Sequence, residues 1–559
     1  MRRRPLSAVA ACFLLVIIGF VGTASAAPVE VLGRGGHVHV VNNPFLPTSA
    51  LPPGPAAVAG PRPAPHPAPP LARVAAAKPK PKPKPKPKPP QVTVGSVLHK
   101  LELGGAITAA QYGTYLAAWN GALAEEKHLS TARRAQLAQE TVLLHDIAAA
   151  GQMTAARLPV LFLTLQRNAE WWQDGSMLSY GQRVQFAGSN LVWEYYPGQG
   201  IQLQVLGTFG EADGYYEAGR GSYPQLQSLM TEMIPLAVHR AGALTWEYYF
   251  NWDGGSPPWV SAMAQATAIE ALTNAYRATG SQSYLTLAHQ ALPLLSSAPP
   301  TGVGVRTALG WRFLQYSFAP KLDIINAFLQ TLIGLDSYTQ VSHDATAQQL
   351  FSAGNAQAES ELPAFNTGAW SLYQPGVEDD LSYHQLVTGF AQNLCTATKA
   401  PVYCTTATDF RDDLKAPPVL TQLTQTARSG KSFSLRFRLS KISRVGIEIT
   451  GAGAKANVRP AVYTSAQYPY GVDAIKVEKL KPGSYDVKLT ATDLAGNYVS
   501  LTGSLTVYKG GTPPPTPPPP TTSTTTTPTS TATTPTTTAT TPTTTVTTPA
   551  LPPSGGGPL

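Results

Sequence analysis

The chain has 559 residues and a formal net charge of +9, and 52 of its residues are prolines. One Lys-Pro repeat between Lys78 and Lys88 contributes six of the positive charges, so the rest of the chain is only mildly basic. The charge therefore does not indicate a nucleic-acid partner. The residues outside low-complexity stretches are numerous enough for two or three domains, each with its own core.

Residues 1–26 have the pattern of a secretory signal peptide. Arginines at 2–4 precede an apolar run over 8–21, and small residues at 24–26 fit the site that signal peptidase accepts. The run is shorter than the ~20 apolar residues of a spanning helix, which favours cleavage over a retained membrane anchor. No later stretch is long and apolar enough to span a bilayer, so we expect a secreted or envelope-associated protein.

Residues 27–93 are expected to form a linker. The segment from Pro44 to Pro90 is rich in proline and alanine and has almost no large apolar residues, so it cannot bury enough surface to offset the cost of ordering. The Lys-Pro alternation within it predicts an extended, self-repelling polyproline spacer.

Two kinds of periodicity follow the linker. Helical spacing of apolar residues from about Val97, and again from Ser130 to Ala150, predicts a small helical unit over 94–180. Alternating apolar residues between Gln182 and Val205 then predict a short β segment. From about 223 to 393 a period near 3.6 returns, with turns between successive helices. This pattern predicts an α/α toroid, or helical barrel, over 181–414.

The C-terminal part reads as strands and then as low-complexity sequence. Strict alternation, as in Phe433, Leu435, Phe437 and Leu439, predicts a β-sandwich over 417–508. It resembles the immunoglobulin-like accessory modules of bacterial exported enzymes. We expect it to fold by itself and to be dispensable for chemistry. The threonine- and proline-rich tail, 509–559, is expected to be disordered.

Cysteines are few. Cys12 lies in the predicted signal peptide, which leaves Cys395 and Cys404. Outside the cytoplasm these two are expected to form a disulfide, which stabilises the fold by about 2 to 3 kcal/mol through loop entropy. Two cysteines without a histidine pattern make a poor metal site, and we expect neither a metal nor another cofactor.

Clusters of tryptophan and tyrosine are the main chemical signal. Aromatic faces with polar tips suit sugar rings, although each residue alone is more simply explained as core. No Ser-His-Asp elbow, phosphate-binding loop, dinucleotide fingerprint or zinc pattern occurs in the sequence. A glycosidase-like carboxylate pair stays open among Glu194, Glu211, Asp213, Glu247 and Asp253. The aromatic clusters are Trp193, Tyr195 and Tyr196; Trp246, Tyr248 and Tyr249; Trp252 and Trp259; Trp311 and Tyr316; and Trp370 and Tyr373.

Five short segments occur in an order and spacing that match a known family. They are Tyr196-Pro-Gly-Gln-Gly200 with Gln202, 258–265, 326–335, 362–371 and Tyr383-His384. Through them the region from about Trp193 to Asn393 resembles the C-terminal domain of D-glucuronyl C5-epimerases. Members of this family remove the C5 proton of a D-glucuronate unit in a polymer and return one from the opposite face, which produces L-iduronate.

The resemblance implies a set of catalytic positions. The Glu-Tyr pair of the family falls on Gln315 and Tyr316, the tyrosine of its Tyr-Asp-Thr-Gly motif on Phe365, and its Tyr-His pair on Tyr383 and His384. Neither glutamine nor phenylalanine exchanges a proton near neutral pH. We therefore expect weakened or lost epimerisation. Three explanations stay open: a register shift of about one residue between Trp311 and Tyr316, a substitute in His384 or a nearby acid, or a domain that binds a glycan without epimerising it.

The aromatic clusters and the resemblance together predict one cleft that contains Trp311, Tyr316, Tyr383 and His384. The expected partner is a uronate-containing polysaccharide or an envelope glycan. Two other classes stay open: a non-catalytic glycan-binding protein, and a polysaccharide lyase or glycosidase on a related toroid. The candidate substrate-binding residues are Trp193, Tyr196, Gln199, Trp259, Gln265, Trp311, Asn326, Asn366 and Trp370.

Overall fold

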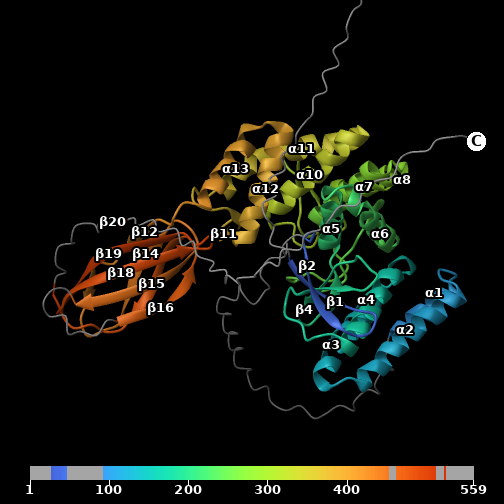
Figure 1. Cartoon of the computed structure of the whole chain (residues 1–559), viewed down its shortest axis with the longest axis horizontal. Helices are drawn as coiled ribbons and strands as arrows, with labels where there is room; N and C mark the ends of the chain where they lie inside the picture. Colours follow the sequence, from blue (N-terminus) through green and yellow to red (C-terminus); the bar gives the residue numbers. More distant parts are fainter. Residues whose placement is uncertain (1–26, 47–91, 452–460, 512–521, 524–559) are drawn as a thin grey trace, which may run out of the picture.

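The computed structural model describes residues 27–46, 92–451, 461–511 and 522–523. The predicted signal peptide, most of the predicted linker and most of the Thr/Pro tail lie outside the described residues. Figure 1 shows a large helical body joined to a smaller β-rich body near the C-terminal end. Within the described residues, no helix has the length and apolar character needed to cross a membrane.

The N-terminal strands correct the predicted linker. Residues 27–46 belong to the folded body, because β1 pairs with β2 and also, in parallel, with β3 about 150 residues later. Val29 is completely buried there. Only 47–91 of the predicted linker remains, and it lies outside the described residues. The five-stranded sheet has the order β2-β1-β3-β4-β5, with β1 Ala27–Leu32, β2 Val38–Asn43, β3 Arg183–Phe186, β4 Trp193–Tyr196 and β5 Gly200–Leu203.

A unit of helices packs beside this sheet. Thr93 and Thr108 begin the first two helices with capping boxes, which satisfy backbone N–H groups that have no partner inside the helix. The side chain of Asn168 exchanges two hydrogen bonds with the backbone of Ile201, at 2.7 and 2.9 Å, and so joins the last helix to β5. The helices are α1 Val94–Leu103, α2 Ala109–His128, α3 Thr131–Ala149 and α4 Leu158–Asp174.

The rest of the helical body is a two-layered array. Its helices contact one another in pairs (α5 with α6, α7 with α8, α10 with α11, α12 with α13), and α5, α7, α10 and α12 form a continuous inner row. Gly334 permits the close approach of α10 to α7, because a Cβ there would lie 2.4 Å from the carbonyl oxygen of Ala266. The helices are α5 Val205–Glu217, α6 Tyr223–Met233, α7 Ala262–Thr279, α8 Gln282–Ala291, α9 Pro293–Ser296, α10 Ile325–Ser342, α11 Ala345–Glu361, α12 Leu381–Thr398 and α13 Pro401–Asp413.

Short hairpins connect these helices. Cys395 and Cys404 form the expected disulfide, which joins α12 to α13 with Cα atoms 4.8 Å apart. The hairpin β10–β11 lies directly before α12, and it meets the β-rich body (Figure 1). The hairpin strands are β6 Val238–Arg240, β7 Ala243–Thr245, β8 Gly304–Arg306, β9 Trp311–Phe313, β10 Leu372–Gln374 and β11 Val377–Glu378.

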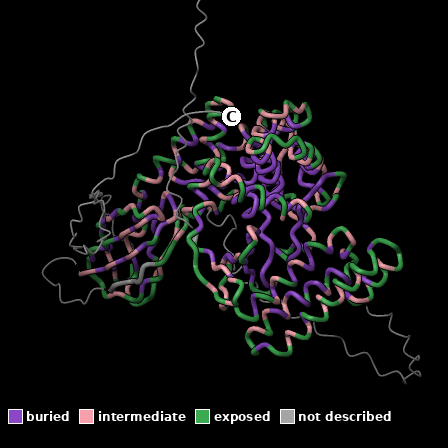
Figure 2. Tube along the Cα trace, turned by 45° about the vertical axis from the view of Figure 1, so that its right-hand side comes forward, coloured by how far each residue is buried: buried purple, intermediate pink, exposed green. Residues whose placement is uncertain are grey.

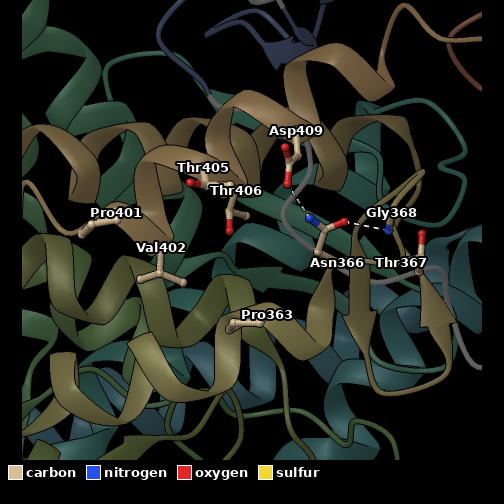
Figure 3. A pocket seen from close by; sticks show the side chains of 9 residues that line it. All are labelled: Pro363, Asn366, Thr367, Gly368, Pro401, Val402, Thr405, Thr406 and Asp409. Carbon is tan, nitrogen blue, oxygen red and sulfur yellow. Dashed lines mark hydrogen bonds between the residues drawn. The ribbon is translucent and has the colours of Figure 1, made fainter.

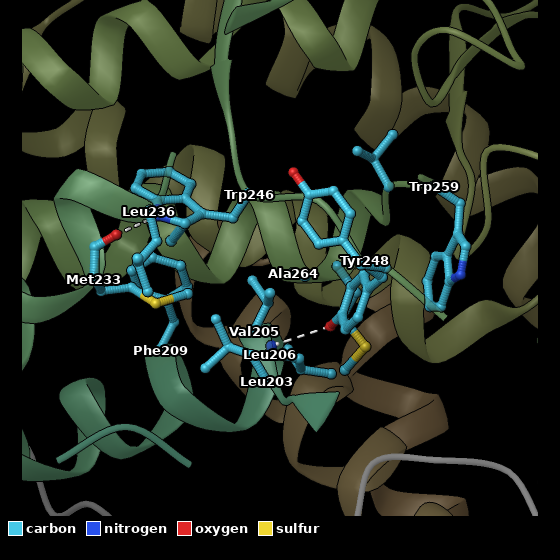
Figure 4. Packing of buried hydrophobic residues seen from close by; sticks show 14 of the residues in the cluster. Leu203, Val205, Leu206, Phe209, Met233, Leu236, Trp246, Tyr248, Trp259 and Ala264 are labelled. Atoms are coloured by element: carbon cyan, nitrogen blue, oxygen red, sulfur yellow. Dashed lines mark hydrogen bonds between the residues drawn. The ribbon is translucent and has the colours of Figure 1, made fainter. Parts of the chain in front are cut away.

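The helical body and its sheet share one hydrophobic core. Buried residues run through the centre of the body in Figure 2. Figure 4 shows part of this core, where Trp246 packs edge-on against Phe209 at 4.8 Å and its indole N–H donates to the carbonyl of Met233. Tyr248 and Trp259 stack nearby at 4.2 Å. Many of the clustered aromatics are therefore core residues, a reading that the sequence had left open.

The C-terminal body consists of two sheets around a second, separate core. Leu435 and Phe437 from one sheet and Val487 and Leu489 from the other are fully buried in it, so the two sheets pack face to face. Within the described residues, one sheet has the order β12-β14-β17 and the other β13-β19-β18-β15-β16, with β20 beside β19. The strands are β12 Leu420–Gln422, β13 Thr426–Arg428, β14 Phe433–Leu439, β15 Ser443–Gly451, β16 Ala461–Tyr468, β17 Gly471–Val477, β18 Gly483–Asp493, β19 Tyr498–Tyr508 and β20 Thr522–Ser523.

Candidate functional site

Three tyrosines from separate elements converge in the helical body. Tyr316 follows β9, Tyr373 lies in β10, and Tyr383 lies in the first turn of α12. The rings of Tyr373 and Tyr383 meet edge to face with centroids 5.2 Å apart. Burial raises the pKa of Tyr373 and of Tyr383, and Tyr316 lies close enough to both to raise it further. We call Tyr316, Tyr373 and Tyr383 the phenol cluster.

Local hydrogen bonds fix the segments that carry these phenols. The carboxylate of Asp380 accepts from the backbone N–H of Tyr383 at 2.9 Å and caps α12. The backbone of Ser317, next to Tyr316, donates to the carbonyl of Val260 at 2.9 Å, and the Ser317 hydroxyl accepts from the N–H of Val260. The loop of Tyr316 is thereby attached to the segment that leads into α7.

Several polar atoms of the cluster are buried without a partner. Within the described part of the chain, the Tyr383 hydroxyl makes no hydrogen bond, and the Tyr316 hydroxyl makes none of good geometry, although Trp252, Tyr373 and Gln315 lie close to it. Both residues are buried, with 2% exposure for Tyr316 and 3% for Tyr383. The indole N–H of Trp252 and the carbonyl of Gln315 are unpartnered as well, and both groups lie near the Tyr316 hydroxyl. Such a group costs about 1–3 kcal/mol when it stays unsatisfied, which points to a bound ligand as its partner.

The phenols are all protonated at neutral pH. Burial raises the pKa of Tyr316 to about 12, although Trp252, Tyr373 and Gln315 lower it somewhat. Burial also raises the pKa of Tyr383 well above its ordinary value, and the charges of Tyr316 and Asp380 add to that effect. Without a ligand, the cluster is therefore a set of hydrogen-bond donors and contains no base.

Aromatic walls enclose the cluster. Trp259 and Phe318 pack against Tyr316 at 5.6 and 5.3 Å between ring centroids. Tyr180, in the loop before β3, is 38% exposed and lies parallel to Trp252 at 6.4 Å. Its pKa is raised by burial and then by the charges of Glu194 and Tyr316. Tyr180 thus lies where the cluster approaches solvent.

The five acids that could form a glycosidase pair do not share one place. Glu194 is beside the wall: it is fully buried, pairs with Arg183 at 3.3 Å, and its pKa is raised by burial against the opposing effect of that arginine. Asp253 lies close enough to Tyr316 that its charge adds to burial in raising the pKa of Tyr316. The remaining three hold the fold together. Glu211 accepts from Asn43, Gln185 and Tyr215; Asp213 accepts from Asn274; and Glu247 binds Arg157, Arg240 and Tyr249.

Phe365 and His384, two of the expected catalytic positions, both lie buried in the core. Phe365 is the buried last residue of the 3-10 helix Leu362–Phe365, and the third phenol of the cluster is Tyr373. The ring of His384 stacks on Trp370 at 3.8 Å, and its two nitrogens bond Ser371 and the carbonyl of Phe410. Burial lowers the pKa of His384 to about 4, so this imidazole is a neutral core group.

The candidate substrate-binding residues are distributed over several environments. Gln265 is buried and its amide donates to the carbonyls of Leu244 and Ala291, which is a structural role. Trp311, also expected in the cleft, packs under the guanidinium of Arg306 at 3.9 Å. Trp193, Tyr196, Trp259, Asn326 and Trp370 are buried, and of these Trp259 contacts the cluster and Tyr196 contacts Trp252, whereas Gln199, Trp311 and Asn366 are half-buried.

Asn366 lies in a different place, an open depression of about 640 Å³ beside α13. Figure 3 shows its amide between Asp409 and Gly368, to which it is bonded at 3.0 and 2.8 Å. Its polar atoms are therefore already engaged. The phenol cluster does not line this depression. Among the described residues, no group of three His, Cys, Asp or Glu side chains could hold a metal ion.

Sequence comparison links this part of the chain to known proteins. Residues 240–412 match the sequence model of a family described as D-glucuronyl C5-epimerase C-terminus. A D-glucuronyl C5-epimerase of Caenorhabditis elegans is 34% identical over 132 residues, which cover 21% of this chain and 21% of that protein. An uncharacterized protein of Methanocaldococcus jannaschii is 25% identical over 138 residues, which cover 23% of this chain and 44% of its own. The matched part of the chain thus covers about a fifth of the first relative's length and less than half of the second's.

Structural likenesses are weak. An endo-β-1,4-glucanase of Acetobacter xylinum aligns with a TM-score of 0.31 and 13% identity, over 41% of this chain and 75% of that one. A cellobiose 2-epimerase of Bacillus thermoamylovorans aligns with a TM-score of 0.27 and 14% identity, over 38% of this chain and 59% of that one. At these values neither likeness carries an argument about the activity of this chain.

Proposed function

Residues 240–412 belong to the D-glucuronyl C5-epimerase C-terminal family, and from this premise we propose that the chain acts on a uronate unit of a polysaccharide at the phenol cluster. One observation carries the proposal. Tyr316, Tyr373 and Tyr383 all lie in the matched segment and converge, with two buried hydroxyls that have no partner in the described structure. A sugar carboxylate or hydroxyl supplies the missing acceptors.

The chemistry follows from donors that face one ligand. A phenolate on one face of the sugar takes the C5 proton, and phenolic O–H groups stabilise the negative charge that develops on the uronate carboxylate. A second phenol then gives its proton to C5 from the other face and becomes the phenolate. The proton count is thereby conserved. Tyr316 and Tyr383 are the two phenols that have free hydroxyls for these steps.

The ionisation of a phenol limits this reaction. With a pKa of about 12, Tyr316 loses its proton at pH 7 at a cost of about 7 kcal/mol. A carboxylate at position 315 would lower that cost by accepting the proton, but Gln315 cannot. We therefore infer that epimerisation is slow in the natural protein and that glycan binding is retained.

A glucuronate polymer incubated with the protein in deuterated water tests the proposal. Deuterium at C5, lost in Tyr316→Phe and Tyr383→Phe, is the expected result. A new ultraviolet-absorbing unsaturated end would instead identify a lyase, which begins with the same proton abstraction. Retention on the polymer with neither product would identify the second candidate, a non-catalytic glycan-binding protein, which the presence of Gln315 favours. Absence of binding and of exchange would refute a role in uronate chemistry.

The proposal also covers the fold of the helical body, the fold of the β-rich body and export of the chain. The paired helices support an α/α toroid, and the two packed sheets support an immunoglobulin-like accessory module. Export by the signal peptide is part of the proposal, and the sequence pattern of residues 1–26 supports it. Sequencing the N-terminus of the protein from the culture medium of an expressing bacterium tests export. A start at Ala27 is expected, and retention in the cytoplasm with Met1 would contradict it.

A further inference from the structure

One carboxylate of the helical body holds both sheets of the β-rich body. Glu378, at the end of β11, accepts from the backbone N–H of Ile442 and from that of Tyr470, each at 2.7 Å. Ile442 directly precedes β15 of the larger sheet, and Tyr470 directly precedes β17 of the smaller one. Burial raises the pKa of Glu378 to about 7, and in the ionised form of Glu378 both bonds are charge-assisted and stronger than an ordinary pair of backbone bonds.

A buried lysine strengthens the same junction. Lys441, next to Ile442, is 1% exposed, pairs with Asp493 at 2.9 Å and donates to the carbonyls of Asp413 and Ala416. Its ammonium also lies 5.2 Å over the ring of Trp370. A buried charge with all these partners resists separation, because breaking the contacts would leave it uncompensated. The two bodies are therefore fixed to each other on the segment that begins at Trp370.

That segment carries two of the three phenols. Within the hairpin, Glu378 is paired with Leu372, the neighbour of Tyr373. The next residue, Asp379, accepts from the Ser371 hydroxyl at 2.6 Å, and Asp380 caps the helix that bears Tyr383. A displacement of Glu378 is thus transmitted to both phenols through the hairpin pairing and through the helix cap.

We propose that Glu378 is a positioning residue, through which the β-rich body holds Tyr373 and Tyr383 in the arrangement of the phenol cluster. The β-rich body is then a part of the site, contrary to the expectation that it is dispensable for chemistry. The effect on catalysis rests on the proposed function. The effect on the order of residues 370–384 rests on the contacts alone and can be measured without any substrate.

Three variants of the full chain test this proposal. Glu378→Ala removes both acceptors, whereas Glu378→Gln keeps the shape and one acceptor. Glu448→Ala, in β15, is the matched control, because Glu448 faces its strand partner Lys488 and has no described bond to the helical body. Amide hydrogen exchange is followed by mass spectrometry for the peptide 370–384 and for the rest of both bodies.

Exchange in 370–384 should become about 10-fold or more faster in Glu378→Ala, less so in Glu378→Gln, and unchanged in Glu448→Ala. Unaltered exchange there, or an equal acceleration throughout both bodies, would overturn the proposal. If Glu378→Ala does not fold, Glu378→Gln decides by the same criterion. Where the natural protein exchanges C5 protons, kcat should fall in Glu378→Ala with little change in KM. A natural protein without C5 exchange refutes the proposed function and leaves the hydrogen-exchange result valid.

Discussion

The ring of Tyr373 meets the ring of Tyr383 edge to face, although one residue lies in a hairpin and the other in a helix. Tyr373 is a third phenol in this place, whereas the resemblance aligned the family's tyrosine with Phe365. The contact between the two rings also brings to one place two side chains whose elements are positioned by Glu378 and Asp380.

The free hydroxyls should be dispensable for stability and necessary for function. Tyr383→Phe removes a buried hydroxyl that has no described partner, so the free energy of unfolding should stay the same or rise by about 1 kcal/mol. C5 exchange should fall about 100-fold or more. Urea unfolding and the deuterium assay measure the two effects. Tyr403→Phe is the control: it loses a 2.8 Å bond to Asn355 and should destabilise the protein by about 1 kcal/mol. A similar loss of stability in both variants would contradict this prediction.

A single substitution should restore faster exchange. Gln315→Glu places a carboxylate next to Tyr316, whose hydroxyl lies near the present amide, and should raise the rate of C5 exchange. Phe365→Tyr should give no gain, because it buries a new hydroxyl in the core, and should cost about 1–3 kcal/mol of stability. Exchange that rises only when both changes are combined would show that position 365 does face the substrate.

His384 should make the protein sensitive to acid. Its pKa in the folded state, about 4, is below the ordinary value of 6.5, so the unfolded chain binds a proton before the folded one does. The resulting stability is fully present above pH 6.5 and is lost as the pH falls toward 4, by about 3 kcal/mol in total. The free energy of unfolding is measured at pH 7 and at pH 4.5 for the natural protein and for His384→Gln. Buried acids change stability with pH in the opposite direction; burial raises the pKa of Asp379, for example, to about 7. Because both proteins contain these acids, the difference between them isolates the contribution of His384. Equal losses in both proteins would exclude the assignment.

The disulfide should contribute to stability but not to chemistry. Replacing Cys395 and Cys404 together by alanine should lower the free energy of unfolding by about 2 to 3 kcal/mol, from the entropy of a loop of nine residues. The rate of C5 exchange by the folded protein should be unchanged. Thermal unfolding and the deuterium assay check both statements, and a folded variant without activity would show that the link between α12 and α13 also shapes the site.

The sequence by itself determined the local structure and part of the site. Helical and strand periodicity report which face of an element is buried, and this depends only on neighbouring residues, so the paired helices and the two-sheet body could be predicted. The motifs singled out Tyr316 and Tyr383, which the structure brings into one cluster, because each lies in a recognisable short segment. The pairing of Cys395 with Cys404 could be predicted because only these two cysteines remain outside the predicted signal peptide.

Only the tertiary structure decided which distant residues meet. The pairing of β1 with β3 depends on packing across about 150 residues, so residues 27–46 read as linker. The sequence does not distinguish a tyrosine or histidine of the core from one of a functional site. Only the packing shows that His384 stacks against Trp370 and that Tyr373 contacts Tyr383. The contact of Glu378 with two backbone N–H groups has no sequence pattern, because every residue except proline supplies such a donor.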